Sequence, residues 1–189
     1  KKRRSLMKKF LLIFIILSHN SIALGSIKEN IIKNLSNINN LSFKFEQNIN
    51  SKIEKGECII EYPKKIFCDY NSPKNKILVS NGKSIVIITK NGSYYRYPIE
   101  RTPLTYILDK NFLINQIQNL EERIIDNKFV NYTLLKDNNE INIFFDKDNY
   151  TLVGWQTLDI YQNLAITYIS SVKKNMILKK NIFKLPTIN

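Results

Sequence analysis

The sequence predicts a mainly β protein with helices (α+β), built as an unclosed, strongly curved antiparallel β-barrel of about ten to eleven strands. Three observations predict this fold: an amphipathic helical segment at the start, a long series of segments with period-two alternation separated by polar turns, and one apolar insertion with helical spacing inside that series. The helices are expected to cover the open face of the curved sheet. With 189 residues, 43% of them hydrophobic, the chain is expected to form a single domain after its leader.

Residues 1–25 are expected to be a secretory signal peptide, with the true start at Met7 or upstream of it. Two lysines precede the apolar run 10–17, and small residues follow it. The run is about half of the roughly 20 residues that a membrane-spanning helix needs. We therefore expect cleavage before Ser26, and because Ser26 stands where a lipoprotein would need a cysteine, we expect residues 26–189 to be exported without an anchor.

The charge and composition argue against several classes of function. The formal net charge is +13, and +7 remains after Ser26 because six of the 29 basic residues and no acidic one precede it. The lysines are scattered among turns, so we expect no nucleic-acid partner. His19 is the only histidine and lies in the leader, which argues against zinc sites and histidine-based catalysis. No Cys-x-x-Cys pair, phosphate-binding loop or dinucleotide fingerprint occurs, so we expect no metal and no cofactor.

The helix at the start is expected over residues 26–39, where apolar residues recur every three or four positions and Ser26 and Glu29 have capping-box spacing. A strand with one buried face follows, because Leu41, Phe43 and Phe45 alternate with polar residues. The other expected strands are 56–62, 65–70, 76–80, 83–90, 93–97, 123–126, 129–136, 140–146, 152–159 and 164–173. Asn81-Gly82 and Asn91-Gly92 are typical of type I′ hairpin turns.

The apolar insertion between Arg101 and Leu120 predicts one or two short helices, with Pro103 near a helix start. By spacing alone this segment is either a lid over a hydrophobic cavity or a helix that plugs the core. Two strand faces pose the same choice between a cavity wall and an ordinary core. These faces consist of Leu41, Phe43 and Phe45, and of Ile66, Cys68 and Tyr70.

Cys58 and Cys68 lie on the two arms of one predicted hairpin, and export would permit a disulfide. A two-residue turn at Pro63-Lys64 would pair Ile59 with Cys68, and a three-residue turn is expected to leave the two cysteines diagonal. We therefore do not expect a bridge. Adjacent carboxylates such as those at 121–122 point apart and make poor acid–base partners, so we do not expect an enzyme.

Several short elements occur in the order and spacing of a known family. They are Phe45-x-Gln47, Gly56, Tyr62-Pro63-Lys64-Lys65-Ile66-Phe67-Cys68-Asp69-Tyr70-x-x-Pro73, Ile77-Leu78-Val79-Ser80-Asn81-Gly82-Lys83, Thr102-Pro103-Leu104 and Phe183-x-x-Pro186. Together they resemble the periplasmic outer-membrane lipoprotein carrier proteins of the LolA family. The resemblance is dense over residues 41–108 and loose from 123 onward.

The resemblance implies a periplasmic, monomeric half-barrel whose apolar concave face, under a helical lid, takes the acyl chains of lipoproteins. Such carriers receive the lipoprotein from an ATP-driven transporter in the inner membrane and pass it to an acceptor at the outer membrane. By motif position, the acyl-chain cavity would be formed by Leu41, Phe43, Phe45, Ile66, Cys68 and Tyr70. The lid would contain Pro103, Leu104, Ile107 and Leu108.

One position departs from the family. The residue before Pro63 is often an arginine that supports lid closure and ligand transfer, and here it is Tyr62. Its phenol can hydrogen-bond a lid carbonyl but cannot form a charge-assisted pair, so Arg101 beside the lid is a second candidate for the latch. Two other classes stay open: a lipid-binding or sensor domain that prefers free lipids or a regulatory protein, and an exported hydrolase, which needs two carboxylates converging in a cleft.

Overall fold

The computed structural model describes residues 25–71, 75–137, 139–159 and 162–187. The expected signal peptide, residues 1–25, lies outside the described residues except for its last residue, Gly25. Within them, none of the helices has the length and hydrophobicity needed to cross a bilayer. The strands are β1 (Asn40–Ile49), β2 (Lys52–Glu61), β3 (Lys65–Tyr70), β4 (Lys76–Asn81), β5 (Ser84–Thr89), β6 (Tyr94–Pro98), β7 (Arg123–Ile125), β8 (Phe129–Lys136), β9 (Asn139–Asp146), β10 (Leu152–Leu158) and β11 (Leu164–Lys174).

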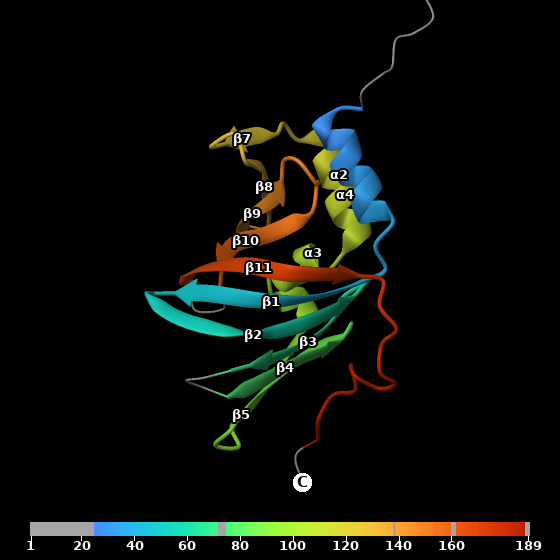
Figure 1. Cartoon of the computed structure of the whole chain (residues 1–189). Helices are drawn as coiled ribbons and strands as arrows, with labels where there is room; N and C mark the ends of the chain where they lie inside the picture. Colours follow the sequence, from blue (N-terminus) through green and yellow to red (C-terminus); the bar gives the residue numbers. More distant parts are fainter. Residues whose placement is uncertain (1–24, 72–74, 138, 160–161, 188–189) are drawn as a thin grey trace, which may run out of the picture.

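The eleven strands form one antiparallel sheet in the order β6-β5-β4-β3-β2-β1-β11-β10-β9-β8-β7. After α2 the chain enters the centre of the sheet as β1, runs outward to β6, crosses over through the helices, and returns inward from β7 to β11 (Figure 1). Because β6 and β7 do not pair with each other, the sheet curves without closing. The predicted fold class is thus confirmed.

The helix at the start is α2 (Ile27–Ser36), and its capping box is formed as predicted. The Ser26 side chain accepts a hydrogen bond from the backbone N–H of Glu29, and the Glu29 carboxylate accepts one from the N–H of Ser26. The central insertion forms the short 3₁₀ helix η1 (Ile99–Arg101), followed by α3 (Leu104–Ile107) and α4 (Lys110–Asn119). Helices α2 and α4 lie side by side next to β8, β9 and β10, whereas α3 lies inside the curve of the sheet (Figure 1).

The hairpins at Asn81-Gly82 and Asn91-Gly92 are present, but their turns are not type I′. A type I′ turn needs positive φ at both central residues, and only the glycines have it, with φ of 93° at Gly82 and 85° at Gly92. Two successive positive φ values occur instead at Asn50-Ser51, in the two-residue turn between β1 and β2. Our turn-type prediction was wrong because the Asn-Gly hairpins have longer loops.

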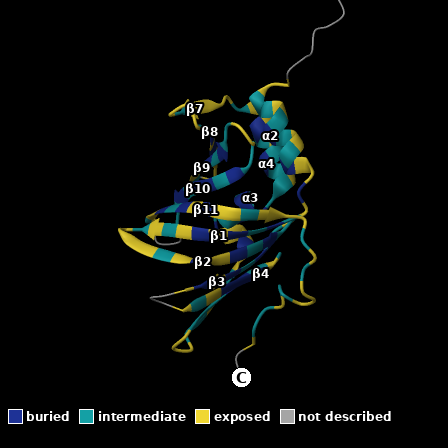
Figure 2. Ribbon diagram, viewed as in Figure 1, coloured by how far each residue is buried: buried dark blue, intermediate teal, exposed yellow. Residues whose placement is uncertain are grey.

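The two sides of the sheet are filled differently, and we call them the packed half and the hollow half. The packed half consists of β7–β10 with α2 and α4, and its inner side chains have 0–5% of their surface exposed. These side chains include Ile31, Leu35, Leu113, Ile117, Val130, Tyr132, Leu134, Ile141, Ile143, Phe145, Leu152 and Trp155. Figure 2 shows buried segments on β8, β10 and α2. The hollow half consists of β1–β6, and neither α2 nor α4 lies over its concave face (Figure 1).

Candidate functional site

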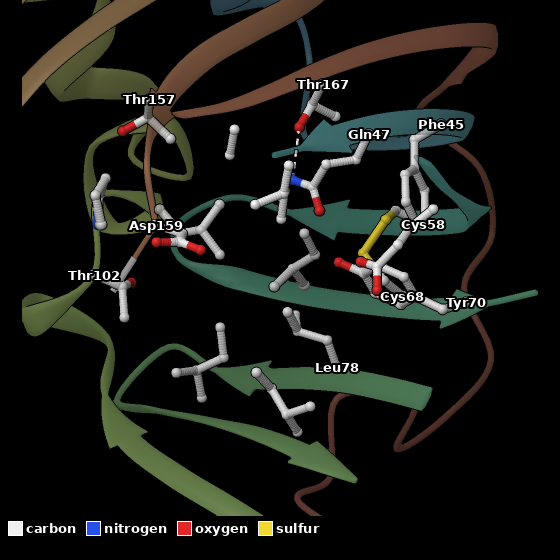
Figure 3. Close-up of a pocket in the computed structure, with 18 of the residues that line it drawn as sticks. Phe45, Gln47, Cys58, Cys68, Tyr70, Leu78, Thr102, Thr157, Asp159 and Thr167 are labelled. Carbon is white, nitrogen blue, oxygen red and sulfur yellow. Dashed lines mark hydrogen bonds between the residues drawn. A yellow bond between two sulfur atoms is a disulfide. The ribbon is translucent and has the colours of Figure 1, made fainter. Parts of the chain in front are cut away.

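The concave face of the hollow half contains a cavity of about 420 Å³ (Figure 3). The apolar walls come from alternate positions of β1–β5, which face inward because successive side chains on a strand point to opposite sides. They include Phe43, Phe45, Cys58, Ile66, Cys68, Tyr70, Leu78, Ile85 and Ile87. The lone tryptophan, Trp155 of β10, closes the side next to the packed half, with its ring centroid 6.2 Å from that of Phe43.

A glycine shapes one wall of this cavity. Gly56 lies between Phe45 and Tyr70 in the register of β1, β2 and β3. Since it has no side chain, the two flanking rings meet across it in an edge-to-face contact, with centroids 4.8 Å apart. A Cβ at this position would lie 2.1 Å from the carbonyl oxygen of Asp69. The close approach of β2 and β3 here therefore requires glycine.

Cys58 and Cys68 form a disulfide in the cavity wall, which corrects our expectation of unbridged cysteines. The loop between β2 and β3 has three residues, and Glu61 pairs with Lys65. Counting three residues back and three forward from that pair brings the cysteines directly opposite each other, with Cα atoms 4.1 Å apart. The diagonal placement expected for a three-residue turn was therefore wrong.

Five of the six residues predicted for the acyl-chain cavity line it: Phe43, Phe45, Ile66, Cys68 and Tyr70. Leu41 does not line it. Leu41 pairs with Ile60 near the start of β1, and both side chains are buried in the core, with 1% and 0% exposed. Inward and outward side chains thus alternate along the whole of β1, but Leu41, the first inward residue, belongs to the core and not to the cavity wall.

The predicted lid divides into two parts. Pro103 and Leu104 line the cavity together with Thr102. Ile107 and Leu108 do not line it and are buried in the core, with 1% and 0% exposed. The C-terminal end of α3 is therefore part of the hydrophobic core, and the cavity is covered by the segment before α3 and by its first residue.

The two candidate latch residues make no polar contact with the lid among the described residues. The Tyr62 hydroxyl is buried without a hydrogen-bond partner there, and burial raises its pKa well above the ordinary value. A backbone contact joins the same loop to the C-terminal end of α3 instead: the N–H of Lys64 donates to the carbonyl oxygen of Leu108 at 2.7 Å. Arg101 is exposed and lines a separate polar pocket of about 340 Å³ with Tyr106 and other residues.

Sequence reasoning missed the polar side chains of the cavity. Gln47, Glu54, Lys76, Thr89 and Thr167 all line it, although they occupy the same inward-facing positions as the apolar residues. Strand alternation alone predicts which face a residue occupies and not whether that face is apolar. Charged, amide and hydroxyl side chains repeated at inward positions of several strands are the signal that could have found them.

The described residues contain no cluster of three or more His, Cys, Asp or Glu side chains suited to hold a metal ion. Two carboxylates, Glu54 and Asp159, line the cavity. Glu54 forms an ion pair with Lys76, with 2.6 Å between Nζ and Oε2. The arrangement can enclose an apolar chain and offer hydrogen bonds to a polar group attached to it.

Comparisons with known proteins agree with this geometry. The sequence profile of the family described as outer membrane lipoprotein carrier protein LolA matches residues 36–186. No curated protein matches the sequence significantly. The fold resembles the crystal structure of MucB, with a TM-score of 0.50 and 11% identity over 84% of this chain and 62% of that one.

Two further structures are similar at lower scores. A LolA superfamily protein from Nitrosomonas europaea has a TM-score of 0.42 and 9% identity, covering 85% of this chain and 99% of that one. A putative outer membrane lipoprotein-sorting protein domain from Vibrio parahaemolyticus has a TM-score of 0.45 and 8% identity, covering 84% of this chain and 97% of that one. The family match supports a periplasmic, lipid-binding domain in general terms. Since the match extends over well more than half of the sequence, the chain belongs to the LolA family of outer-membrane lipoprotein carrier proteins.

Proposed function

We propose that this protein is a periplasmic carrier that binds the acyl chains of lipoproteins in the cavity of the hollow half. The observation that carries the proposal is an apolar cavity of about 420 Å³, bounded by the sheet on one side and by Pro103 and Leu104 on the other. Its volume lies within the range of roughly 300–1,000 Å³ found for ligand sites. The cavity residues are Phe43, Phe45, Ile66, Cys68 and Tyr70, and no covalent chemistry is required of them.

Burial of the acyl chain supplies the binding energy. Each CH₂ group removed from water contributes about 0.8 kcal/mol, so a chain with ten buried CH₂ groups gains roughly 8 kcal/mol before the costs of binding. Such a gain holds the lipid in solution, yet it is weaker than insertion of several chains into a bilayer. Transfer from the inner membrane to the carrier therefore needs an energy source, which an ATP-driven transporter in that membrane supplies. Transfer from the carrier to an outer-membrane acceptor is favourable.

The lid sets how tightly the cargo is held. We propose that Leu104 packs on the empty cavity and moves outward when acyl chains enter, while Leu108 stays in the core under its contact with Lys64. The apolar contacts that Leu104 loses on opening offset part of the gain from binding. This difference keeps the cargo exchangeable.

A release assay tests the carrier function. Spheroplasts whose inner membranes hold a radiolabelled triacylated lipoprotein are incubated with purified residues 26–189, and label in a soluble one-to-one complex is counted. We expect release of the acylated lipoprotein and none of an unacylated version.

Two adjacent residues of β4 provide a matched pair of variants. Leu78 lines the cavity, and Ile77 lies on the opposite face of the strand with 39% of its surface exposed. Leu78→Gln should abolish release, whereas Ile77→Gln should retain it. If the wild-type protein is folded by circular dichroism and releases nothing, lipoprotein carriage is wrong, and binding of free lipid or of a regulatory protein becomes the function to test.

A further inference from the structure

A band of polar side chains crosses the concave face of the sheet at one level, from β11 into the strands of the hollow half. We call it the polar belt; it consists of Thr167 of β11, Gln47 of β1, Glu54 of β2, Lys76 of β4 and Thr89 of β5. Strand register places these residues next to one another. Thr167 is opposite Gln47, Gln47 is opposite Glu54, and Lys76 is opposite Thr89. Strand β3, which lies between β2 and β4, contributes Tyr70 at this level, because Tyr70 is opposite Lys76.

Two contacts join four of the five belt residues in pairs. The Gln47 side-chain amide donates to the Thr167 hydroxyl at 2.9 Å, a bond that Figure 3 shows crossing from β1 to β11. Lys76 and Glu54 form their ion pair while only 19% and 16% of their side chains are exposed. The Lys76 ammonium also lies 4.2 Å from the centroid of the Tyr70 ring. The pair is thus held within the wall of the cavity instead of extending into solvent.

Hydrogen-bonding capacity remains in the belt. Among the described residues, neither the side-chain carbonyl oxygen of Gln47 nor the second carboxylate oxygen of Glu54 accepts a hydrogen bond. The Gln47 amide uses one of its two N–H groups there. A ligand that reaches this level can therefore both donate to the belt and accept from it.

The cavity differs on the two sides of the belt. On the side toward the disulfide, the lining residues Phe43, Ile66 and Ile85 are each 2% exposed. At and beyond the belt the lining is open to solvent: Ile49 is partly exposed and Tyr95 is 45% exposed. An amphipathic ligand fits this gradient in one direction, with its acyl chain toward the disulfide and its polar end at the belt.

We propose that the polar belt is a subsite for the uncharged ester and amide groups through which acyl chains join their headgroup, and that it selects against anionic phospholipids. The inference rests on the proposed function, since it concerns the same cavity. An anionic phosphate attracted to Lys76 would meet the carboxylate of Glu54, already paired at 2.6 Å. Its entry would require the pair to separate and would place two like charges together in a half-buried site. Neutral carbonyl and hydroxyl groups carry no such cost.

The lone tryptophan allows a direct test, because Trp155 lines the cavity and its fluorescence reports occupancy. The probes are dioctanoylglycerol and dioctanoyl phosphatidylglycerol, which share their acyl chains and differ in the anionic phosphoglycerol. Both are titrated into residues 26–189 below their critical micelle concentrations. We expect the wild-type protein to bind the neutral lipid about tenfold more tightly than the anionic lipid.

Two variants should move this ratio in opposite directions. Glu54→Gln removes the carboxylate charge with little change in shape and should bring the two affinities within about twofold of each other. Lys76→Met should widen the preference for the neutral lipid. Glu46→Gln is the matched control, because Glu46 pairs with Lys55 at 2.7 Å in an exposed ion pair on the outer face of β1. It should leave the ratio at the wild-type value.

The outcomes separate this inference from the proposed function. If both lipids bind, and Glu54→Gln and Lys76→Met leave the ratio of the two affinities unchanged, the polar belt does not select the headgroup. The proposal that the cavity binds acyl chains is then retained. The same conclusion follows if the wild-type protein prefers the anionic lipid. If neither lipid changes Trp155 fluorescence and a triacylated lipopeptide does not bind, the carrier function fails and the subsite with it.

Discussion

The packed half and the hollow half show one sheet put to two uses. Strands in both halves alternate inward and outward side chains in the same way. In the packed half, α2 and α4 cover the inner face, and Ile141, Ile143 and Phe145 of β9 are 0% exposed. In the hollow half, the part of the chain that the structure describes covers the inner face with the short segment around Leu104, and a cavity of about 420 Å³ remains. Helix placement therefore decides whether an alternating face becomes core or binding surface.

The largest expected effect contrasts one large core side chain from each half. Phe145→Ala in the packed half should lower the free energy of unfolding by about 3–5 kcal/mol, because it opens a void among fully buried neighbours. Leu78→Ala in the hollow half should cost less than about 2 kcal/mol, since one side of this residue already faces the cavity. Urea unfolding of the two variants measures both values. Equal losses would mean that the halves are packed alike.

The disulfide lies in the hollow half, where it joins β2 to β3. Replacing both cysteines, in the double variant Cys58→Ala and Cys68→Ala, should lower the free energy of unfolding by about 3 kcal/mol, because the bridge closes a short loop in the unfolded chain. Hydrogen exchange locates the effect. Amides of β2 and β3 should lose more protection than those of β8 and β9, because without the bridge the hollow half opens locally before the whole domain unfolds. Equal loss across the sheet would show that the halves unfold as one unit.

The two parts of the predicted lid segment should respond differently to truncation. Leu108→Ala should lower the free energy of unfolding by about 2–3 kcal/mol, as expected for a leucine that is 0% exposed. Leu104→Ala should lower it by about 1 kcal/mol or less, because Leu104 is partly exposed at the cavity. It should instead change the affinity for dioctanoylglycerol, measured by Trp155 fluorescence. A stability loss at Leu104 as large as that at Leu108 would argue against a movable lid segment.

The smallest expected effect concerns a buried hydroxyl in the packed half. Tyr132 is 0% exposed, and its hydroxyl has no hydrogen-bond partner among the described residues. Burial is the main cause that raises the pKa of this hydroxyl, and the negative charge of Glu122 adds to it. Tyr132→Phe should therefore raise the free energy of unfolding at pH 7 by about 0.5–1 kcal/mol. Chemical denaturation at neutral pH measures the gain.

The same group predicts the pH dependence of stability. A tyrosine whose pKa is raised in the folded state contributes stability that is complete below the unfolded value of about 10 and is lost as the pH rises further. The wild-type protein should lose stability above pH 10, and Tyr132→Phe should lose about 1 kcal/mol less between pH 10 and pH 11. If the free energy of unfolding falls equally with pH in the two proteins above pH 10, Tyr132 is not the group responsible for the loss. Tyr62 and Tyr70 are the other buried phenols whose pKa is raised.

Much of the fold could be predicted from the sequence because it depends on local patterns. The capping box at Ser26, the strand alternation and the proline near the start of α3 each have a local physical cause. The turn type at Asn81-Gly82 was wrong because loop length depends on how the flanking strands pair. The disulfide was missed for the same reason: one residue of register decides whether Cys58 is opposite Cys68.

The cavity could be predicted only in part. Phe43 and Ile66 line it, and alternation placed them on the correct face. Alternation could not show that Leu41 lies beyond the end of the cavity, or that Ile107 belongs to the core, because both depend on where the helices pack. The polar belt was missed because its residues come together only when six strands, β11 and β1 to β5, are aligned.

The pairing of β1 with β11 has a consequence for how the chain folds. Within each half, every strand pairs with its neighbour in sequence, so these pairings close short loops. The contact between β1 and β11 instead joins residues far apart, with a sequence separation of 120 between Gln47 and Thr167. Non-local pairings of this kind slow folding, because the entropy of a long loop is lost before the contact forms. We expect hairpins of each half to form first and the central seam to close last, leaving the edge of β1 open to other chains until then.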